Sequence, residues 1–238
     1  MDFKIIHINE TDSTNRWLRD YAPLEHAKDV VVVADYQTAG KGCGTNSWES
    51  ERGKNLTFSL LIHPQDIPAN RQFHITEVVS VALCQTLESY IYNKVEIKWP
   101  NDIYVGDRKI CGILIENRLQ GSVIKDSIIG IGLNVNQREF RSDAPNPVSL
   151  WQLLGHETDR DELMQKFLSC LTVVSAAENT VSDYRKRLFR RGKTAVYAAG
   201  AERFKAELID VEPDGHLLLR DEKGQRRTFA FKEVQFII

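Results

Sequence analysis

Short apolar runs rich in β-branched residues recur along the first 133 residues, and they constrain the fold more than any other feature of the sequence. Such runs, bounded by polar turn residues, are typical of strands. Several follow one another through short turns, Gly106-Asp107 being one, so much of the resulting sheet is expected to be antiparallel. The expected strands cover residues 3–8, 30–35, 56–62, 96–98, 109–116 and 127–133.

Helical patterns separate some of these strands. Asp12 or Ser13 can cap a helix that runs to about Tyr21, because a short polar side chain accepts a hydrogen bond from a free first-turn amide. Amphipathic stripes predict a longer helix over residues 73–90, and another over 163–177 whose pattern extends toward residue 189. Residues 1–189 are therefore expected to form an α+β domain, with a mixed, largely antiparallel sheet flanked by helices.

Beyond Gly192 the apolar period changes to two, as in strands. Five short strands are expected, joined by turns such as Glu212-Pro213-Asp214-Gly215. Closely spaced hairpins suggest a small closed barrel, so residues 190–238 are assigned to a separate C-terminal β-barrel domain. These strands cover residues 194–198, 204–211, 216–220, 226–231 and 234–238.

The sequence has no features of a membrane or secreted protein. Its longest apolar runs, such as residues 30–34, are far shorter than the ~18 residues that a membrane span needs. Residues 1–10 lack the basic start and the apolar stretch of a signal peptide. The four cysteines are scattered and form no ligand cluster with the six histidines. We expect a cytoplasmic protein with free thiols and no zinc site.

The charges are unevenly distributed, although the net charge is only -2. From Tyr184 to the end, 13 basic side chains accompany 8 acidic ones. The overall charge argues against a general nucleic-acid binder, whereas the basic tail leaves open a non-enzymatic adaptor that binds peptide or RNA. A basic run on a helix is, however, usually a solvated face. The run consists of Arg185, Lys186, Arg187, Arg190 and Arg191.

Residues 37–48, called the glycine-rich loop below, are the most informative segment. Three glycines within five positions let the backbone approach a ligand, Lys41 adds positive charge, and Trp48 adds a flat apolar surface. Such a loop suits a phosphate ester, although composition alone explains it equally well as a mobile surface loop. It is not a Walker-type loop, because Gly42 and not Ser or Thr follows Lys41.

Two further features point to a ligand. A strand delivers Lys98, Pro100 ends that strand, and Asn101 and Asp102 can fix the following turn, so the lysine is rigidly aimed. Such a lysine can stabilise charge on a phosphoryl group, although a solvated lysine above a buried Trp99 explains the isolated segment as well. Strand glycines indicate a close approach to the backbone, so one sheet face is expected to bear a ligand. These glycines are Gly112, Gly130 and Gly132.

Taken in order, these segments resemble those of the biotin–protein ligases, enzymes that attach biotin to a lysine of carboxylase carrier domains. The resemblance implies a class II synthetase-like fold with a small C-terminal barrel. Longer members carry an N-terminal helix-turn-helix and act as repressors; because the first motif here begins at residue 12, we expect no binding to nucleic acid. The matching segments are Asp-Ser-Thr-Asn at 12–15, Gln-Thr-Ala-Gly at 37–40, Lys-Trp-Pro-Asn-Asp-Ile at 98–103, Lys-Ile-Cys-Gly-Ile-Leu-Ile-Glu at 109–116 and Gly-Ile-Gly-Leu-Asn-Val-Asn at 130–136.

The resemblance also implies roles for individual residues. Lys98 corresponds to the catalytic lysine that faces the biotin carboxylate and the α-phosphate of ATP, and Asn134 matches an asparagine associated with the nucleotide phosphates and magnesium. Positions that correspond to biotin contacts are Ser13, Thr14, Asn15 and Gln37. Lys41, Gly42 and Cys43 lie in the loop that closes over the acyl-adenylate. Glu116 is a further residue of the pocket. The remaining expected binding residues are Gly40, Trp48, Asn101, Lys109 and Gly112.

The chain departs from the family pattern in one respect. Many members have arginines in the glycine-rich loop where this chain has Cys43 and Asn46. Lys41 is therefore the only basic residue between Gly40 and Trp48. This difference leaves open how tightly the loop retains an acyl-adenylate, while the reaction type is unaffected.

The implied reaction has two steps and needs no covalent enzyme intermediate. Biotin attacks the α-phosphorus of ATP with the help of magnesium, which gives biotinyl-5'-AMP and pyrophosphate, and a lysine of a biotin carboxyl carrier protein then accepts the biotinyl group. The alternative within the same fold is a lipoate or octanoate protein ligase or transferase, against which Lys98-Trp99-Pro100-Asn101-Asp102 favours biotin. Exposed sheet edges would allow a homodimer.

Overall fold

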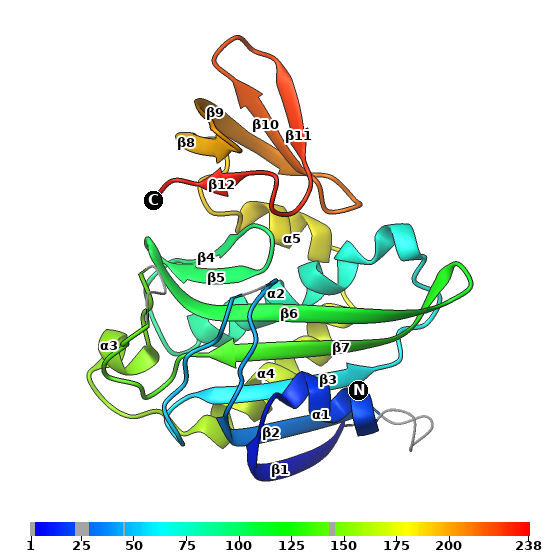
Figure 1. Cartoon of the computed structure of the whole chain (residues 1–238), viewed down its shortest axis with the longest axis vertical. Coiled ribbons are helices and arrows are strands. Elements are labelled where there is room, and N and C mark those ends of the chain that lie inside the picture. Colours follow the sequence, from blue (N-terminus) through cyan, green and yellow to red (C-terminus); the bar gives the residue numbers. More distant parts are fainter. Residues whose placement is uncertain (1–2, 22–28, 45, 143–145) are drawn as a thin grey trace.

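The computed structural model describes residues 3–21, 29–44, 46–142 and 146–238 (Figure 1). A seven-stranded sheet has the order β1-β2-β3-β7-β6-β5-β4, with one parallel pair, β1 and β2, and antiparallel pairs elsewhere. The predicted α+β class and largely antiparallel sheet are confirmed. The strands are β1 (Phe3–Thr11), β2 (Asp29–Gln37), β3 (Leu56–Ile62), β4 (Val95–Lys98), β5 (Asp102–Val105), β6 (Arg108–Gln120) and β7 (Val123–Leu133).

The two faces of this sheet are covered differently. Helices α2 (Phe73–Glu88) and α4 (Arg160–Ser175) pack together over one face, where side chains such as Phe58 and Ile131 form the main core. Helix α1 (Thr14–Tyr21) lies on the opposite face, against β2, β3 and β7 (Figure 1). Strand side chains alternate between the faces. The α1 face is therefore the one on which a ligand can lie.

Several element boundaries differ from the sequence-based expectation. The third predicted helix stops at Ser175, and a separate helix, α5 (Thr180–Lys186), follows. The Thr180 hydroxyl donates to the Val174 carbonyl at 2.9 Å, so the chain turns where the amphipathic pattern would have continued. Strand β5 and helix α3 (Leu150–Leu154) were not predicted; α3 begins with a capping box formed by Ser149 and Gln152.

The C-terminal strands form a second sheet in the order β11-β10-β9-β8-β12. The predicted hairpins are present, but β11 and β12 lie at opposite edges and do not pair, so an open antiparallel sheet replaces the expected closed barrel. The strands are β8 (Thr194–Ala199), β9 (Glu202–Val211), β10 (Leu217–Asp221), β11 (Arg226–Phe229) and β12 (Gln235–Phe236).

The two sheets share one hydrophobic core. Tyr197 and Leu208 of the C-terminal sheet belong to the same buried cluster as Ile97 and Trp99 beside the large sheet. Trp99 Nε1 also donates to the Gly215 carbonyl at 2.8 Å. The C-terminal sheet is therefore held firmly against β4 and α5 (Figure 1). The division into domains at residues 189 and 190 stays a prediction. Within the described ranges, no helix is long and apolar enough to cross a membrane.

We expect Gly215→Ala to destabilise this junction. Gly215 has a φ of 94°, and a Cβ atom there would lie 2.6 Å from Cδ2 of Phe73. Backbone strain and overpacking together should lower the free energy of unfolding by about 2–5 kcal/mol, as measured by urea denaturation. Gly224→Ala is the matched control, since Gly224 has a φ of 80° but nothing within 4 Å of its Cβ position. Equal losses in the two variants would contradict the packing argument.

Candidate active site

A strip of glycines runs across the α1 face of the large sheet. Gly112 of β6 pairs with Gly132 of β7, and Gly130 lies two residues away on the same face. Side chains approach the backbone closely there: a Cβ atom on Gly130 would lie 2.3 Å from Asn15 Oδ1, and one on Gly132 would lie 2.3 Å from Cε2 of Trp48. The glycines thus leave room for site side chains that any larger residue would displace.

A cluster of uncharged polar groups, Thr14, Asn15, Gln37 and Ser59, lies at one end of the strip. Ser59 Oγ is 2.7 Å from Thr14 Oγ1 and 2.6 Å from Asn15 Oδ1, and the Thr14 hydroxyl is 3.1 Å from Gln37 Oε1. Gln37 Oε1 also accepts a hydrogen bond from the Thr14 amide at 2.8 Å. Asp12 or Ser13 was expected to cap the first turn of α1, and Gln37 bonds this first-turn amide instead. We call these four residues the polar cluster.

Contacts with Glu116 hold the polar cluster in place. Asn15 Nδ2 donates to Glu116 Oε2 at 2.9 Å, and Arg19 pairs with the other oxygen of Glu116 at 2.6 Å. Ser13, also predicted to bind, is buried at the start of α1 beside the cluster. Sequence reasoning missed Ser59, which is fully buried. The signal was a serine at a ligand-face position of a mostly apolar strand.

The glycine-rich loop folds back over the strip. The Trp48 amide donates to the Gly40 carbonyl at 2.9 Å, and the Gly42 amide to the Asn46 carbonyl at 2.8 Å. This return lays the Trp48 indole on Gly112 and Gly132. Trp48 Nε1 is buried against Gly132 without a hydrogen-bond partner in the described part of the chain.

The Lys109 ammonium lies at the other end of the strip. It is 2.6 Å from Asp102 Oδ1 and 5.6 Å from the Trp48 ring centroid, and a Cβ atom on Gly112 would be 3.1 Å from it. An irregularity in the β5–β6 pairing aims it there: Ile103 pairs with Cys111 but Tyr104 with Lys109, so Ile110 is an extra residue. This bulge turns Lys109 onto the α1 face, away from the core.

Lys98, the predicted catalytic residue, lies farther toward the C-terminal sheet. Its ammonium is 5.3 Å from the ring of Tyr104 and 5.2 Å from that of Phe236. Burial lowers the pKa of Lys98, and the nearby cation of Lys109 lowers it further, while Asp102 opposes the shift. The lysine that lies over the glycine strip is therefore Lys109.

Two asparagines fix the segments around Lys109. Asn101 Nδ2 donates to the Ile113 carbonyl and lies 3.5 Å from Cys43 Sγ, so it joins β6 to the glycine-rich loop. Asn134 Nδ2 donates to the Val148 carbonyl at 3.0 Å, whereas its Oδ1 is buried without a partner in the described residues. An amide oxygen in this state fits a divalent cation. The described residues contain no group of three or more His, Cys, Asp or Glu that could hold a metal, so such a cation would depend on ligand phosphates.

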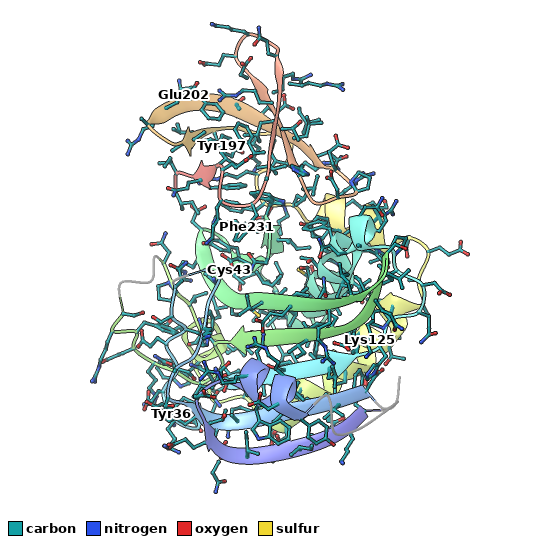
Figure 2. The ribbon with its side chains drawn as sticks, turned by 45° about the vertical axis from the view of Figure 1, so that its right-hand side comes forward. Tyr36, Cys43, Lys125, Tyr197, Glu202 and Phe231 are labelled. Atoms are coloured by element: carbon teal, nitrogen blue, oxygen red, sulfur yellow. The ribbon has the colours of Figure 1, made fainter. Side chains whose placement is uncertain are left out.

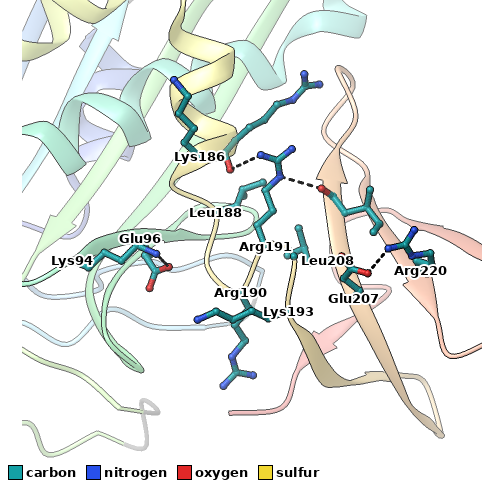
Figure 3. Close-up of a pocket in the computed structure, with 13 residues that line it drawn as sticks. Lys94, Glu96, Lys186, Leu188, Arg190, Arg191, Lys193, Glu207, Leu208 and Arg220 are labelled. Carbon is teal, nitrogen blue, oxygen red and sulfur yellow. Dashed lines mark hydrogen bonds and ion pairs between the residues drawn. The ribbon is translucent and has the colours of Figure 1, made fainter. Parts of the chain in front are cut away.

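The predicted basic run serves the fold. It borders a cavity of about 560 Å³ between β4, α5 and the C-terminal sheet (Figure 3), whose lining includes none of the residues predicted to bind biotin or ATP. Arg185 and Arg191 pair with Asp210 at 3.1 and 3.8 Å, and Arg191 also donates to the Ile209 carbonyl. These pairings use Arg185 and Arg191 to hold the C-terminal sheet in place, while the cavity lining as a whole stays basic.

The whole arrangement matches a ligand with three different parts. The polar cluster suits an uncharged hydrogen-bonding group, the indole and glycines suit an apolar arm, and the Lys109 ammonium suits an anion. From Ser59 on β3 to Asp102 on β5 the array crosses three strand spacings, roughly 14 Å. An acid with a polar ring at its far end fits this order, with its carboxylate beside Lys109.

Comparisons with known proteins agree on one family. The model of the Biotin/lipoate A/B protein ligase family matches residues 8–134. A bifunctional ligase/repressor BirA of Bacillus spizizenii is 30% identical and covers 95% of this chain and 72% of that protein. A biotin--[acetyl-CoA-carboxylase] ligase of Paracoccus denitrificans is 26% identical and covers 95% of this chain and 98% of that protein.

Solved structures share the fold. The biotin protein ligase from Aquifex aeolicus, in complex with biotin and ATP, superposes with a TM-score of 0.80 at 24% identity and covers 98% of this chain and 99% of that one. The Leishmania major biotin protein ligase in complex with biotinyl-5-AMP gives a TM-score of 0.66 at 21% identity, covering 95% of this chain and 98% of that one. The second, C-terminal sheet is therefore part of a fold that these proteins have in common.

Proposed function

Since the chain belongs to the biotin/lipoate A/B protein ligase family, we propose that it activates biotin with ATP to biotinyl-5'-AMP and transfers the biotinyl group to a lysine of a biotin carboxyl carrier protein. The observation that carries this proposal is the order of groups on the α1 face: polar cluster, indole on glycine, then ammonium. The proposal is also supported by relatives named as biotin ligases from bacteria and human.

We assign the parts of biotin to this order. The ureido ring is both donor and acceptor and would pair with the polar cluster, which offers hydroxyl and amide groups of both kinds. The valeryl arm would lie along the Trp48 indole, and the carboxylate would face Lys109. Lys98 is then a second cation near the phosphates. Its lowered pKa reflects burial between two rings.

In the adenylation step the residues mainly supply charge and positions. The Lys109 ammonium would neutralise the carboxylate as it attacks the α-phosphorus and would hold the mixed anhydride afterwards. Magnesium, when bound, would neutralise phosphate charge, and Asn134 Oδ1 is the side-chain oxygen suited to it. The folded glycine-rich loop would keep water from the anhydride until the acceptor lysine arrives.

A lipoate or octanoate substrate is disfavoured by the polar cluster. An acyl chain or a dithiolane ring cannot hydrogen-bond to Thr14, Asn15, Gln37 or Ser59, so such a substrate would forgo the polar contacts that a ureido ring can make with this cluster. The identity of the carrier, a cytoplasmic location, a homodimer and the absence of nucleic-acid binding stay predictions.

Exchange of labelled pyrophosphate into ATP tests the function directly. The exchange should require both biotin and magnesium and should not occur when lipoate or octanoate replaces biotin. An apo carrier domain should then gain the mass of one biotinyl group. Exchange with lipoate but not with biotin would overturn the proposal in favour of the alternative substrate class, and no exchange with any of these acids would remove the adenylation step itself.

A further inference from the structure

Lys232, in the turn between β11 and β12, contacts the glycine-rich loop. A Cβ atom on Gly44 would lie 2.1 Å from Nζ and 3.1 Å from Cε of Lys232, so the ammonium rests directly on the Gly44 backbone. Figure 2 shows Cys43, the residue before Gly44, beneath Phe231, the residue before Lys232. A segment near the C-terminus therefore reaches the loop that covers the ligand face.

The backbone around Lys232 is held in an unfavourable conformation. Lys232 has a φ of 71°, which is uncommon for a residue other than glycine. The turn is closed by the Glu233 amide, which donates to the Ala230 carbonyl at 3.1 Å, and by the Ala230 amide, which donates to Glu233 Oε2 at 2.7 Å. These bonds fix the direction in which the lysine leaves the turn.

The Lys232 charge is not used within the described part of the protein. No carboxylate of the described residues lies within 4.0 Å of its ammonium, whereas Arg190, Arg220 and Arg227 in the same C-terminal region all have acidic partners. The nearest ring is that of Phe231, 5.8 Å away, and Phe231 is 45% exposed. The ammonium is thus free to bind an anion at the edge of the site.

The anion supplied by the reaction is a phosphate. The loop itself has a single basic residue in this part, Lys41, whose side chain is exposed. Cys43 joins the loop to Asn101, which lies on the segment next to Asp102 and Lys109. Both Lys232 and Lys109 lie close enough to Cys43 to oppose the rise that burial causes in the pKa of its thiol, so the two ammonium groups approach the same residue of the loop.

We propose that Lys232 is a phosphate-binding residue that helps to retain the acyl-adenylate, so that the C-terminal sheet supplies the charge that the glycine-rich loop lacks at Cys43 and Asn46. This inference rests on the proposed function, because the phosphate is that of the adenylate formed there. It gives the C-terminal sheet a direct part in the site. The carrier domain is the other source of an anion, and the experiment distinguishes the two.

The test measures release of the intermediate in the absence of a carrier. Biotinyl-adenylate is formed on the full-length protein from biotin, magnesium and ATP labelled in the α-phosphate, free nucleotide is removed, and loss of bound label is followed. Lys232→Met keeps the length of the side chain and removes the charge; we expect release about tenfold faster or more. Lys232→Arg should stay near the parent rate, and the gap between parent and Lys232→Met should narrow at high salt.

Matched variants separate charge from conformation. Lys223→Met removes a charge from the β10–β11 turn, which lies at the end of the C-terminal sheet away from the large sheet (Figure 1), and should release the adenylate at the parent rate. Lys232→Gly removes the backbone strain of the positive φ together with the charge. It should release the adenylate as fast as Lys232→Met does, and its free energy of unfolding in urea should be no lower than that of Lys232→Met. Biotin affinity without nucleotide should be unchanged in every Lys232 variant.

Cys43 provides a readout that does not depend on activity. Burial raises the pKa of the Cys43 thiol, and Lys232 is among the cations that oppose this rise. Alkylation of Cys43 should therefore move to higher pH in Lys232→Met than in the parent. Parent-like release by Lys232→Met would overturn the inference while leaving the function intact. So would a defect that appears only with the carrier domain, since Lys232 would then bind the partner protein.

Discussion

Replacing Lys109 with methionine should reduce biotin-dependent pyrophosphate exchange by about 100- to 1,000-fold, the usual loss when a preorganised group that stabilises transition-state charge is removed. The Lys109 ammonium lies between Asp102 and the Trp48 ring, over the glycine strip. Methionine retains the apolar stem and its packing. The variant should therefore lose kcat, while its free energy of unfolding should change little. Lys109→Arg should recover part of the activity.

The same substitution at Lys98 is the informative comparison. Lys98 is held between Tyr104 and Phe236, so Lys98→Met should keep those contacts and cost about tenfold or less in exchange. Urea denaturation of both variants checks that the fold is retained. If Lys98→Met lost more activity than Lys109→Met, the assignment would revert to Lys98 as the residue that faces the carboxylate and the α-phosphate.

The choice between these lysines shows where sequence reasoning reaches its limit. Lys98 ends one expected strand and Lys109 begins another, each beside a turn, and both residues were predicted to bind ligand. What separates them is the bulge at Ile110, which puts Ile110 and Cys111 in succession into the core and turns Lys109 to the ligand face. Strict alternation would have placed Lys109 in the core with Cys111 and Ile113. No local pattern in the sequence marks that extra residue.

Features set by local chemistry were easier to predict. Strand glycines indicated a close approach to the backbone, and at Gly130 and Gly132 the approaching groups are the protein's own Asn15 and Trp48. Contacts between distant segments could not be predicted in this way. Ser59 joins the polar cluster across 44 or 45 residues, and Lys232 reaches Gly44 from the opposite end of the chain, because strand order and packing of the second sheet bring them there.

The glycine strip leads to the second large effect. In Gly132→Ala the new methyl group would lie 2.3 Å from Cε2 and 2.6 Å from Nε1 of Trp48, a rigid ring that cannot yield as a flexible chain end does. The indole must therefore leave the strip, and the apolar wall between the polar cluster and Lys109 is lost. Overpacking of about 1–3 kcal/mol corresponds to about 5- to 150-fold weaker biotin binding, measured by calorimetry.

Gly112→Ala gives a graded control for this prediction. Its methyl group would lie 3.1 Å from Cζ3 of Trp48 and 3.1 Å from Lys109 Nζ, and the lysine end can move aside at little cost. We therefore expect a loss of biotin affinity several times smaller than in Gly132→Ala, with both proteins folded as judged by urea denaturation. Equal affinities in the two variants would mean that Trp48 does not rest on the strip when biotin binds, and the apolar arm would then have to lie elsewhere on the α1 face.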